Sequence, residues 1–272
     1  MNDPESSLPL PFVLNRDFIE TAFAKRFQKW LRHAQQNQSW HVIAAPPGSG
    51  KSRSIHDLMR NSGAYKSATG ITRLPVLAVC APKNDPQETR LLTALASSFG
   101  VLPTMSPAFR RIWVVKMMAT VQVELLVIDD SQDLNLRHLA LLKELTDNLA
   151  APPYERLVGL GLVAAHGSKD VPFRETFARP ETLWQQFHQR MDTQDPYISV
   201  PGLTEKELLP VLATFEDLYR DQLPDLSLHR WNKSIFGWLT SPILDPDGTG
   251  QVLMGNVTKF VSVALRRAYE RR

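Results

Sequence analysis

The sequence has little cysteine, no long apolar run and no strong excess of either charge. Cys80 is the single cysteine among 272 residues, so no disulfide can form within the chain. Its place in an apolar run predicts a buried, inert thiol. No apolar stretch approaches the roughly 20 residues of a membrane-spanning helix, so we expect no membrane partner. The N-terminal segment lacks a basic stretch followed by an apolar one, and we therefore predict a cytoplasmic location.

Charge and histidine content narrow the possible partners only slightly. The formal net charge of +3 permits binding to nucleic acid without requiring it. The seven histidines show no metal-ligand spacing, and a single cysteine argues against a zinc site. The length is sufficient to bury a sizeable core, and the 43% hydrophobic and 22% charged shares are those of an ordinary globular protein.

Five apolar segments alternate with segments of helical periodicity. Nearly continuous apolar runs are expected of parallel strands that are covered on both faces. The alternation therefore predicts a three-layer α/β domain with a five-stranded parallel sheet. The expected strands are residues 40–45, 74–80, 123–129, 157–165 and, more weakly, 197–200.

The pattern changes after the turn at Pro201 and Gly202. Thr204 and Glu207 have the spacing of a capping box, which predicts the start of a helix. Two further amphipathic helices are expected before the C-terminus, so this segment is predicted to be a small helical lid. The expected organisation is an N-terminal extension over residues 1–16, an α/β nucleotide-binding domain over 17–202 and the helical lid over 203–272.

A phosphate-binding loop is indicated by the sequence Ala-Pro-Pro-Gly-Ser-Gly-Lys-Ser at 45–52, which lies between a predicted strand and a predicted helix. Ala45 replaces the usual first glycine of this motif. Backbone N–H groups of such a loop surround the β-phosphate, the lysine contacts the β- and γ-phosphates, and the final hydroxyl binds Mg²⁺. The residues expected to contact ATP or its metal ion are Pro47, Gly48, Ser49, Gly50, Lys51, Ser52 and Arg53.

Two acidic residues follow the apolar run at 125–128. This arrangement holds Mg²⁺ beside the phosphates in nucleotide-hydrolysing enzymes. Asp129 is predicted to act on the metal, directly or through water, and Asp130 on the attacking water. Asp130 is one methylene shorter than a glutamate, so hydrolysis is expected to be slow while binding is retained.

The two motifs together resemble those of the AAA+ ATPases. The residues Ile-Asp-Asp-Ser-Gln-Asp-Leu at 128–134 are similar to the second motif of the branch that contains the transposition regulators TnsC and TniB and the related ExeA-like ATPases. Gln132 and Leu134 match that branch, whereas Asp130 replaces its usual glutamate. The resemblance implies ATP and Mg²⁺ as cofactors, a helical lid and assembly of the protein with copies of itself.

The resemblance also implies two sensor residues. Sensor 1 lies at the end of the fourth strand, where His166 is the best match and Ser168 the reserve. Sensor 2 lies at the start of the last helix, where related proteins have an arginine. This chain has Thr258 at that place, and the adjacent Lys259 could substitute.

The family further supplies an arginine finger to the neighbouring subunit from a position before the fifth strand. Arg190 fits the Gln-Arg-apolar pattern, and Arg174 and Arg179 are its rivals. Each of the three could instead be an ordinary solvated charge.

The resemblance also implies binding to duplex DNA. Each subunit of a ring or filament would contact the phosphate backbone of the DNA in the same way. An ordinary charged helix face is the alternative for each residue. The segments expected to make these contacts contain Lys83, Asn84, Thr104, Arg110 and Arg111.

The sequence therefore predicts an AAA+ ATPase that assembles on duplex DNA with ATP and recruits a transposase and its target-selection protein. Hydrolysis is expected to drive disassembly. A helicase loader similar to the IstB and DnaC proteins would instead prefer single-stranded DNA. A protein-interaction switch would assemble without DNA, and a small-molecule kinase is disfavoured by the lid and by Gln132.

Overall fold

The computed structural model describes residues 18–67, 70–83, 85–100, 106–166 and 171–270. Contacts divide the chain into two units. One comprises residues 26–47 and 51–200, and we call it the α/β unit; the other comprises residues 1–25, 48–50 and 201–272, and we call its part from residue 201 onward the helical unit. Among the described residues no helix has the length and apolar character needed to cross a membrane.

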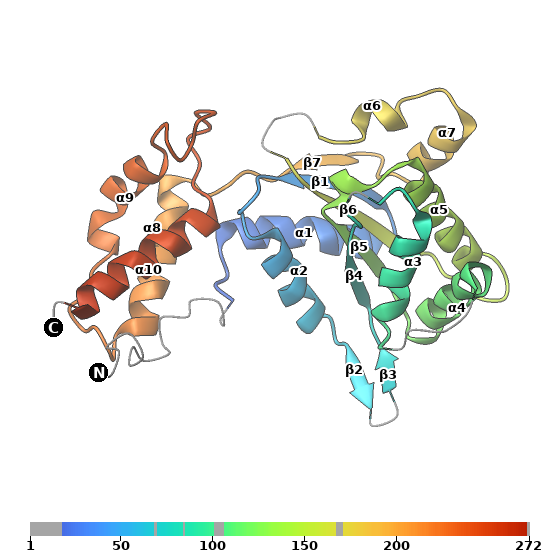
Figure 1. Ribbon diagram of the computed structural model, residues 1–272, viewed down its shortest axis with the longest axis horizontal. Coiled ribbons are helices and arrows are strands. Elements are labelled where there is room, and N and C mark those ends of the chain that lie inside the picture. The colour runs from blue at the N-terminus through green and yellow to red at the C-terminus, as the bar shows by residue number, and fades with distance from the viewer. Residues whose placement is uncertain (1–17, 68–69, 84, 101–105, 167–170, 271–272) are drawn as a thin grey trace, which may run out of the picture. The chain divides into compact units, whose positions relative to one another are not determined.

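A five-stranded parallel sheet forms the centre of the α/β unit, in the order β4-β5-β6-β1-β7 (Figure 1). The predicted three-layer α/β fold is thus confirmed. Ala45 pairs with Ala165, and Cys80 pairs with Asp129, so the carboxyl ends of four strands lie at one edge. The strands are β1 (Trp40–Ala45), β4 (Val76–Cys80), β5 (Leu125–Asp129), β6 (Gly159–Ala165) and β7 (Tyr197–Ser199).

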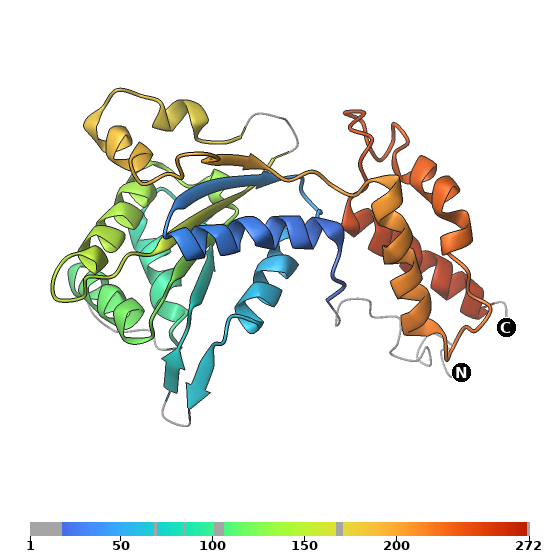
Figure 2. The same ribbon diagram turned by 180° about the vertical axis from the view of Figure 1, so that it is seen from behind.

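Helices cover both faces of the sheet (Figures 1 and 2). On one face α3, α4 and α5 pack in a row and share an apolar core with β1, β4, β5 and β6. On the other face α1 crosses β6. The bounds are α1 (Ala22–Asn37), α2 (Lys51–Arg60), α3 (Glu88–Ser97), α4 (Pro107–Thr120), a short 3₁₀ turn η3 (Ser131–Asp133), α5 (Leu136–Ala150), α6 (Arg174–Phe177) and α7 (Thr182–His188).

Two glycines of β6 allow α1 to lie close to the sheet. A Cβ atom on Gly159 would be 2.2 Å from the carbonyl oxygen of Ala34, and one on Gly161 would be 2.7 Å from the Leu31 side chain. Both distances are shorter than van der Waals contact allows. Gly159 meets backbone atoms, which cannot move aside, whereas Gly161 meets the end of a side chain, which can shift. The close contact fixes α1, and hence the residues near its end, against the centre of the sheet.

A short hairpin precedes β4. Strand β2 (Tyr65–Ser67) pairs antiparallel with β3 (Gly70–Arg73). This hairpin was not predicted from the sequence, because runs of three and four residues are too short to reveal an alternating pattern. The strand expected from residue 74 begins at Val76 instead, since Pro75 offers no N–H to a sheet ladder.

The helical unit contains α8 (Glu205–Tyr219), a 3₁₀ turn η4 (His229–Trp231), α9 (Asn232–Leu239) and α10 (Met254–Glu270). The predicted capping box is present at the start of α8, where Glu207 accepts the Thr204 backbone N–H at 2.9 Å. In the loop before α10, the Asp245 carboxylate accepts bonds from the N–H and hydroxyl of Thr249 and from the N–H of Gly250, at 2.7 to 2.9 Å. The predicted N-terminal extension, residues 1–16, lies outside the described residues.

Candidate nucleotide-binding site

Lys51 begins α2 directly after the loop that leaves β1. Its side chain is 6% exposed, and Nζ donates to the carbonyl oxygens of Ala45, at 3.2 Å, and Pro46, at 3.1 Å. Burial lowers the pKa of Lys51, whereas the charges of Asp129 and Asp130 oppose that change. An ammonium group held by neutral carbonyls at the start of a helix is well placed to bind an anion such as phosphate.

The loop before Lys51 has the backbone that the glycine pattern predicts. Gly48 has φ of 79° and Gly50 has φ of 104°, values in which a side chain would be strained. Alternating backbone conformations of this kind turn successive N–H groups toward one concave side, where they bind anions. Pro47 precedes Gly48, Ser49 lies between the two glycines, and Arg53 is exposed on the first turn of α2.

Ser52 and Asp129 bring two oxygen atoms together between α2 and the end of β5. The Ser52 hydroxyl donates to Asp129 Oδ2 at 2.6 Å, and Asp129 is 8% exposed. Adjacent ligands of an octahedral Mg²⁺ lie about 2.9 Å apart, since each lies about 2.1 Å from the metal. The pair therefore fits neighbouring positions of a magnesium ion with only a small adjustment.

Asp130 follows β5 in a left-handed backbone conformation, with φ of 53° and ψ of 37°. Lys83 forms an ion pair with its carboxylate at 3.7 Å, and Gln132 Nε2 donates to it at 3.5 Å. The side chain of Asp130 is 27% exposed and that of Lys83 is 71% exposed. The contact between Lys83 and the acid predicted to activate water was not anticipated from the sequence, because the two residues come from different strands.

Cys80 corrects one expectation. We predicted a buried thiol, but Cys80 is exposed at the carboxyl end of β4, an edge strand of the sheet. An apolar run buries a residue only where neighbours cover it, and an edge strand has a neighbouring strand on one side alone. Its Sγ lies 3.7 Å from Asp130, and partial desolvation of the thiol, together with the charges of Asp129 and Asp130, raises its pKa. A raised pKa keeps the thiol protonated and unreactive.

The tip of β6 is joined to both motifs. The Ala165 N–H donates to Gln132 Oε1 at 2.8 Å, and the His166 N–H donates to the Ala45 carbonyl at 3.0 Å. His166 thus lies at the edge of the sheet that carries the phosphate loop, and its role as sensor 1 stays a prediction. Ser168, its reserve, lies outside the described residues.

Arg190 lies at the other end of β1. Its carbonyl accepts the N–H of Trp40, the first residue of that strand. Its guanidinium forms an ion pair with Asp147, donates to the Thr146 hydroxyl at 3.2 Å and lies 5.3 Å from the centre of the Trp40 ring. Arg190 is therefore engaged within its own subunit, and its predicted role toward a neighbour would require these contacts to be replaced.

The rival arginines are more accessible. Arg174 and Arg179 are both exposed, at the start of α6 and just after it. Arg174 lies 5.3 Å from the centre of the Tyr197 ring. An exposed guanidinium can reach a neighbouring subunit with less rearrangement than one held in an ion pair.

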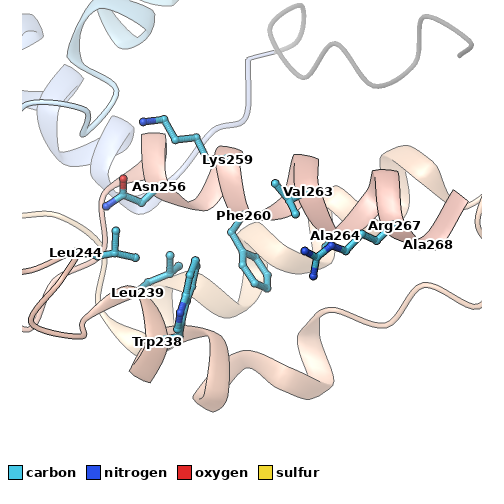
Figure 3. Close-up of a pocket in the computed structure, with 10 residues that line it drawn as sticks. All are labelled: Trp238, Leu239, Leu244, Asn256, Lys259, Phe260, Val263, Ala264, Arg267 and Ala268. Carbon is cyan, nitrogen blue, oxygen red and sulfur yellow. The ribbon is translucent and has the colours of Figure 1, made fainter. Parts of the chain in front are cut away.

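In the helical unit, Lys259 lies on α10 and lines a groove of about 670 Å³ between α9 and α10 (Figure 3). Its other lining residues are mostly apolar, among them Trp238, Phe260 and Val263. The role of Lys259 as a substitute for sensor 2 stays a prediction.

The residues predicted to contact DNA differ in their availability. The Arg110 guanidinium donates to the Thr93 hydroxyl at 2.7 Å, and Arg111 forms ion pairs with Glu88 and with Glu144. These contacts hold both guanidinium groups between helices. Lys83 is more exposed than Arg111, and it forms an ion pair with Asp130. Two further predicted contacts, Asn84 and Thr104, lie outside the described residues.

The geometry up to this point defines a P-loop nucleotide-binding protein: a parallel sheet, a glycine-rich loop leading into α2, and acidic residues at the end of β5. The sequence model of the AAA domain family matches residues 33–168, half of the chain. The chain therefore belongs to the AAA domain family. No curated protein matched the sequence.

Solved structures of the same fold have very different sequences. Cdc6p from Pyrobaculum aerophilum superposes with a TM-score of 0.56 and 14% identity, over 96% of this chain and 65% of that one. The ORC2 protein from Aeropyrum pernix, in its ADP form, superposes with a TM-score of 0.51 and 15% identity, over 94% of this chain and 65% of that one. This chain thus spans slightly less than two thirds of each. At such low identity the likeness shows the fold alone.

Proposed function

We propose that this ATPase is a regulator of transposition that binds duplex DNA, assembles on it with ATP and Mg²⁺, and recruits a transposase with its target-selection protein. The observation that carries the proposal is the end of β5, where Asp129, Asp130 and Gln132 meet the phosphate loop and the tip of β6. These residues also carry the resemblance to the TnsC, TniB and ExeA-like branch.

ATP would be held by Lys51 and the loop N–H groups, with Mg²⁺ on Ser52 and Asp129. Lys51 would then exchange two neutral carbonyl partners for phosphate oxygens. Charge-assisted hydrogen bonds of this kind are about twice as strong as neutral ones. Asp130 would orient the attacking water, and its short side chain makes hydrolysis slow.

Lys83 offers a way for DNA to influence hydrolysis. Its ion pair with Asp130 is long and exposed, and such pairs contribute about 1 kcal/mol or less. A DNA phosphate that bound Lys83 would therefore displace the carboxylate at little energetic cost. The Asp130 carboxylate would then be available to the water, so that DNA binding and ATP hydrolysis are coupled.

Assembly would complete the site with an arginine from the next subunit. Arg190, Arg174 and Arg179 are the candidates, and the contacts of Arg190 within its own subunit favour the two exposed ones. ATP would then hold subunits together, and hydrolysis would release them.

Negative-stain imaging tests the proposal. The protein is imaged with ATP or a slowly hydrolysed analogue, with and without duplex DNA. Nucleotide-dependent rings or filaments on the duplex are expected, and Lys51→Ala should abolish them because the ammonium group is lost. Monomers under all conditions would contradict the proposal.

Two alternative functions give different outcomes in the same experiment. Assembly that prefers single-stranded DNA would indicate a helicase loader similar to IstB and DnaC. Assembly that needs ATP but ignores DNA would indicate a protein-interaction switch. Lys83→Gln adds a second distinction. In a DNA-binding regulator, this substitution should reduce the stimulation of ATP hydrolysis by DNA. In a DNA-independent switch, DNA should not stimulate hydrolysis in either the parent or the variant.

A further inference from the structure

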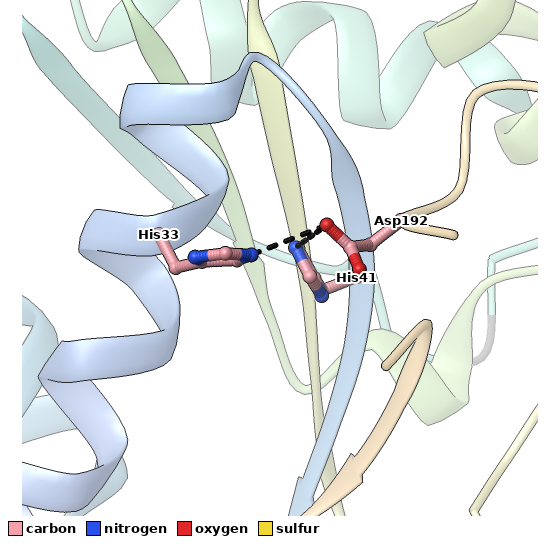
Figure 4. A group of neighbouring side chains, drawn as sticks. All are labelled: His33, His41 and Asp192. Carbon is pink, nitrogen blue, oxygen red and sulfur yellow. Dashed lines mark hydrogen bonds and ion pairs between the residues drawn. The ribbon is translucent and has the colours of Figure 1, made fainter. Parts of the chain in front are cut away.

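Two histidines and an aspartate from separate segments converge at the start of β1, away from the phosphate loop at its end (Figure 4). His33 lies in the last turns of α1, His41 is the second residue of β1, and Asp192 follows α7. The His33 Nε2 to Asp192 Oδ2 distance is 3.2 Å, and the His41 Nε2 to Asp192 Oδ2 distance is 3.8 Å. One ligand atom from each residue lies within 4.8 Å of the others.

We propose that His33, His41 and Asp192 form a zinc-binding site that joins α1, β1 and the loop after α7. Zinc takes imidazole nitrogen and carboxylate oxygen in tetrahedral geometry, with bonds of about 2.0 to 2.2 Å. Neighbouring ligand atoms of such a tetrahedron lie about 3.4 Å apart. The distances of 3.2 and 3.8 Å to Asp192 Oδ2 lie on either side of that value, so small side-chain rotations can place the three ligand atoms around one ion.

The surroundings of His41 hold its ring in the orientation that a metal requires. Its Nδ1 lies 3.0 Å from the carbonyl oxygen of Asp195, which can only accept, so Nδ1 carries the proton. Its Nε2 is then unprotonated, and its lone pair accepts a hydrogen bond from the Ser39 hydroxyl at 2.9 Å. A metal ion would take the place of that hydroxyl proton. Histidines that bind metals commonly donate their other ring nitrogen to a backbone carbonyl in this way.

His33 has a comparable supporting group. Asn37 lies one helical turn further along α1, and its amide nitrogen is 3.1 Å from His33 Nδ1 and 3.0 Å from Nε2. A zinc ion on Nε2 would displace the amide nitrogen from that atom, and turning the amide over would present its oxygen to Nδ1–H. Asn37 would thus act as a positioning residue for His33.

The fourth ligand position is open to a cavity. The cavity has a volume of about 360 Å³ and is lined by His33, Asn37, Ser39, Met191, Asp192, Thr193 and Gln194. The Ser39 hydroxyl or a water molecule can complete the tetrahedron there. The His41 side chain is fully buried behind these residues, so an ion would reach it past His33 and Asp192.

Zinc binding is tested on the full chain without a polyhistidine tag, after treatment with a chelator and in excess Mg²⁺. Titration with ZnCl₂ and metal analysis after dialysis should give one Zn²⁺ per chain, and Co²⁺ should give the visible absorption of a tetrahedral site. Zn²⁺ at a hundredfold excess over its dissociation constant should raise the melting temperature by about 5 °C.

Variants distinguish this cluster from other zinc-binding groups. His33→Gln and Asp192→Asn should lose the bound ion, and Asn37→Ala should weaken its binding by about ten- to a hundredfold. His56→Gln removes an exposed histidine of α2, and Asp129→Asn removes the acid at the phosphate loop. Both controls should retain one Zn²⁺. Failure of the parent chain to bind zinc stoichiometrically, or equal binding by Asp192→Asn, would overturn the proposal.

Discussion

The contacts of Arg190 lead to a quantitative prediction that separates a structural role from a role in a neighbouring subunit. Its side chain is 32% exposed, so the ion pair with Asp147 is partly screened and contributes about 1 kcal/mol or less. The bond to Thr146 adds about 1 kcal/mol, and the contact with the Trp40 ring adds about 0.5 kcal/mol. Arg190→Ala should therefore lower the free energy of unfolding by about 2 kcal/mol and the melting temperature by about 4 to 8 °C.

Thermal unfolding and an ATPase mixing assay check this prediction together. Arg179→Ala is the matched control, because an exposed arginine should change stability by about 0.5 kcal/mol or less. In the mixing assay, Arg190→Ala, which keeps its own phosphate loop, is combined with Lys51→Ala, which keeps Arg190. If Arg190 acts within its own subunit, the mixture should be no more active than the average of its parts. An unchanged melting temperature with recovered activity in the mixture would refute the reasoning.

Three further predictions concern packing, a loop carboxylate and hydrolysis. Gly159→Ala should lower the free energy of unfolding by about 3 kcal/mol, because the new methyl group would clash with the backbone of Ala34. Gly161→Ala should lower it by about 1 kcal/mol, because the Leu31 side chain can move aside. Equal losses in denaturant titrations would contradict this reasoning. Burial alone would raise the pKa of Asp245, but backbone N–H bonds lower it, so its stabilisation is present above about pH 3.9 and is lost as the pH falls through the folded-state pKa. Asp245→Asn should reduce the loss in the free energy of unfolding as the pH falls below about 3.9. An unchanged pH dependence would show that Asp245 does not cause this loss. Asp130→Glu should raise ATP turnover, and an unchanged rate in a steady-state assay would show that the short side chain does not limit hydrolysis.

The sequence was sufficient to predict the architecture because parallel strands have a local signature. The inner strands β1, β5 and β6 are buried on both faces, so their apolar runs are nearly continuous, and the acidic residues lie where β5 ends. Parallel pairing then places all the carboxyl ends at one edge. The proximity of Ser52 and Asp129 follows from that rule, although they are far apart in the chain.

Other features depend on packing between distant segments and have no local signature. The ion pair of Arg190 with Asp147 joins the end of α5 to the segment after α7, and spacing along the chain does not indicate it. The cluster of His33, His41 and Asp192 was missed for the same reason, since no two of these residues have the spacing of a metal-binding motif. The exposure of Cys80 depends on β4 being the outermost strand, which only the strand order reveals.

The left-handed backbone of Asp130 limits which side chains that position can accept. Aspartate and asparagine tolerate this conformation better than longer residues do, because their short polar side chains bond to the nearby backbone. A glutamate there would have a longer side chain but would be less stable in the left-handed backbone conformation. The gain in ATP turnover would therefore come with some loss in the free energy of unfolding. A form that retains ATP without cleaving it is therefore best made as Asp130→Asn rather than with glutamine, and it would allow nucleotide-bound assemblies to be captured intact.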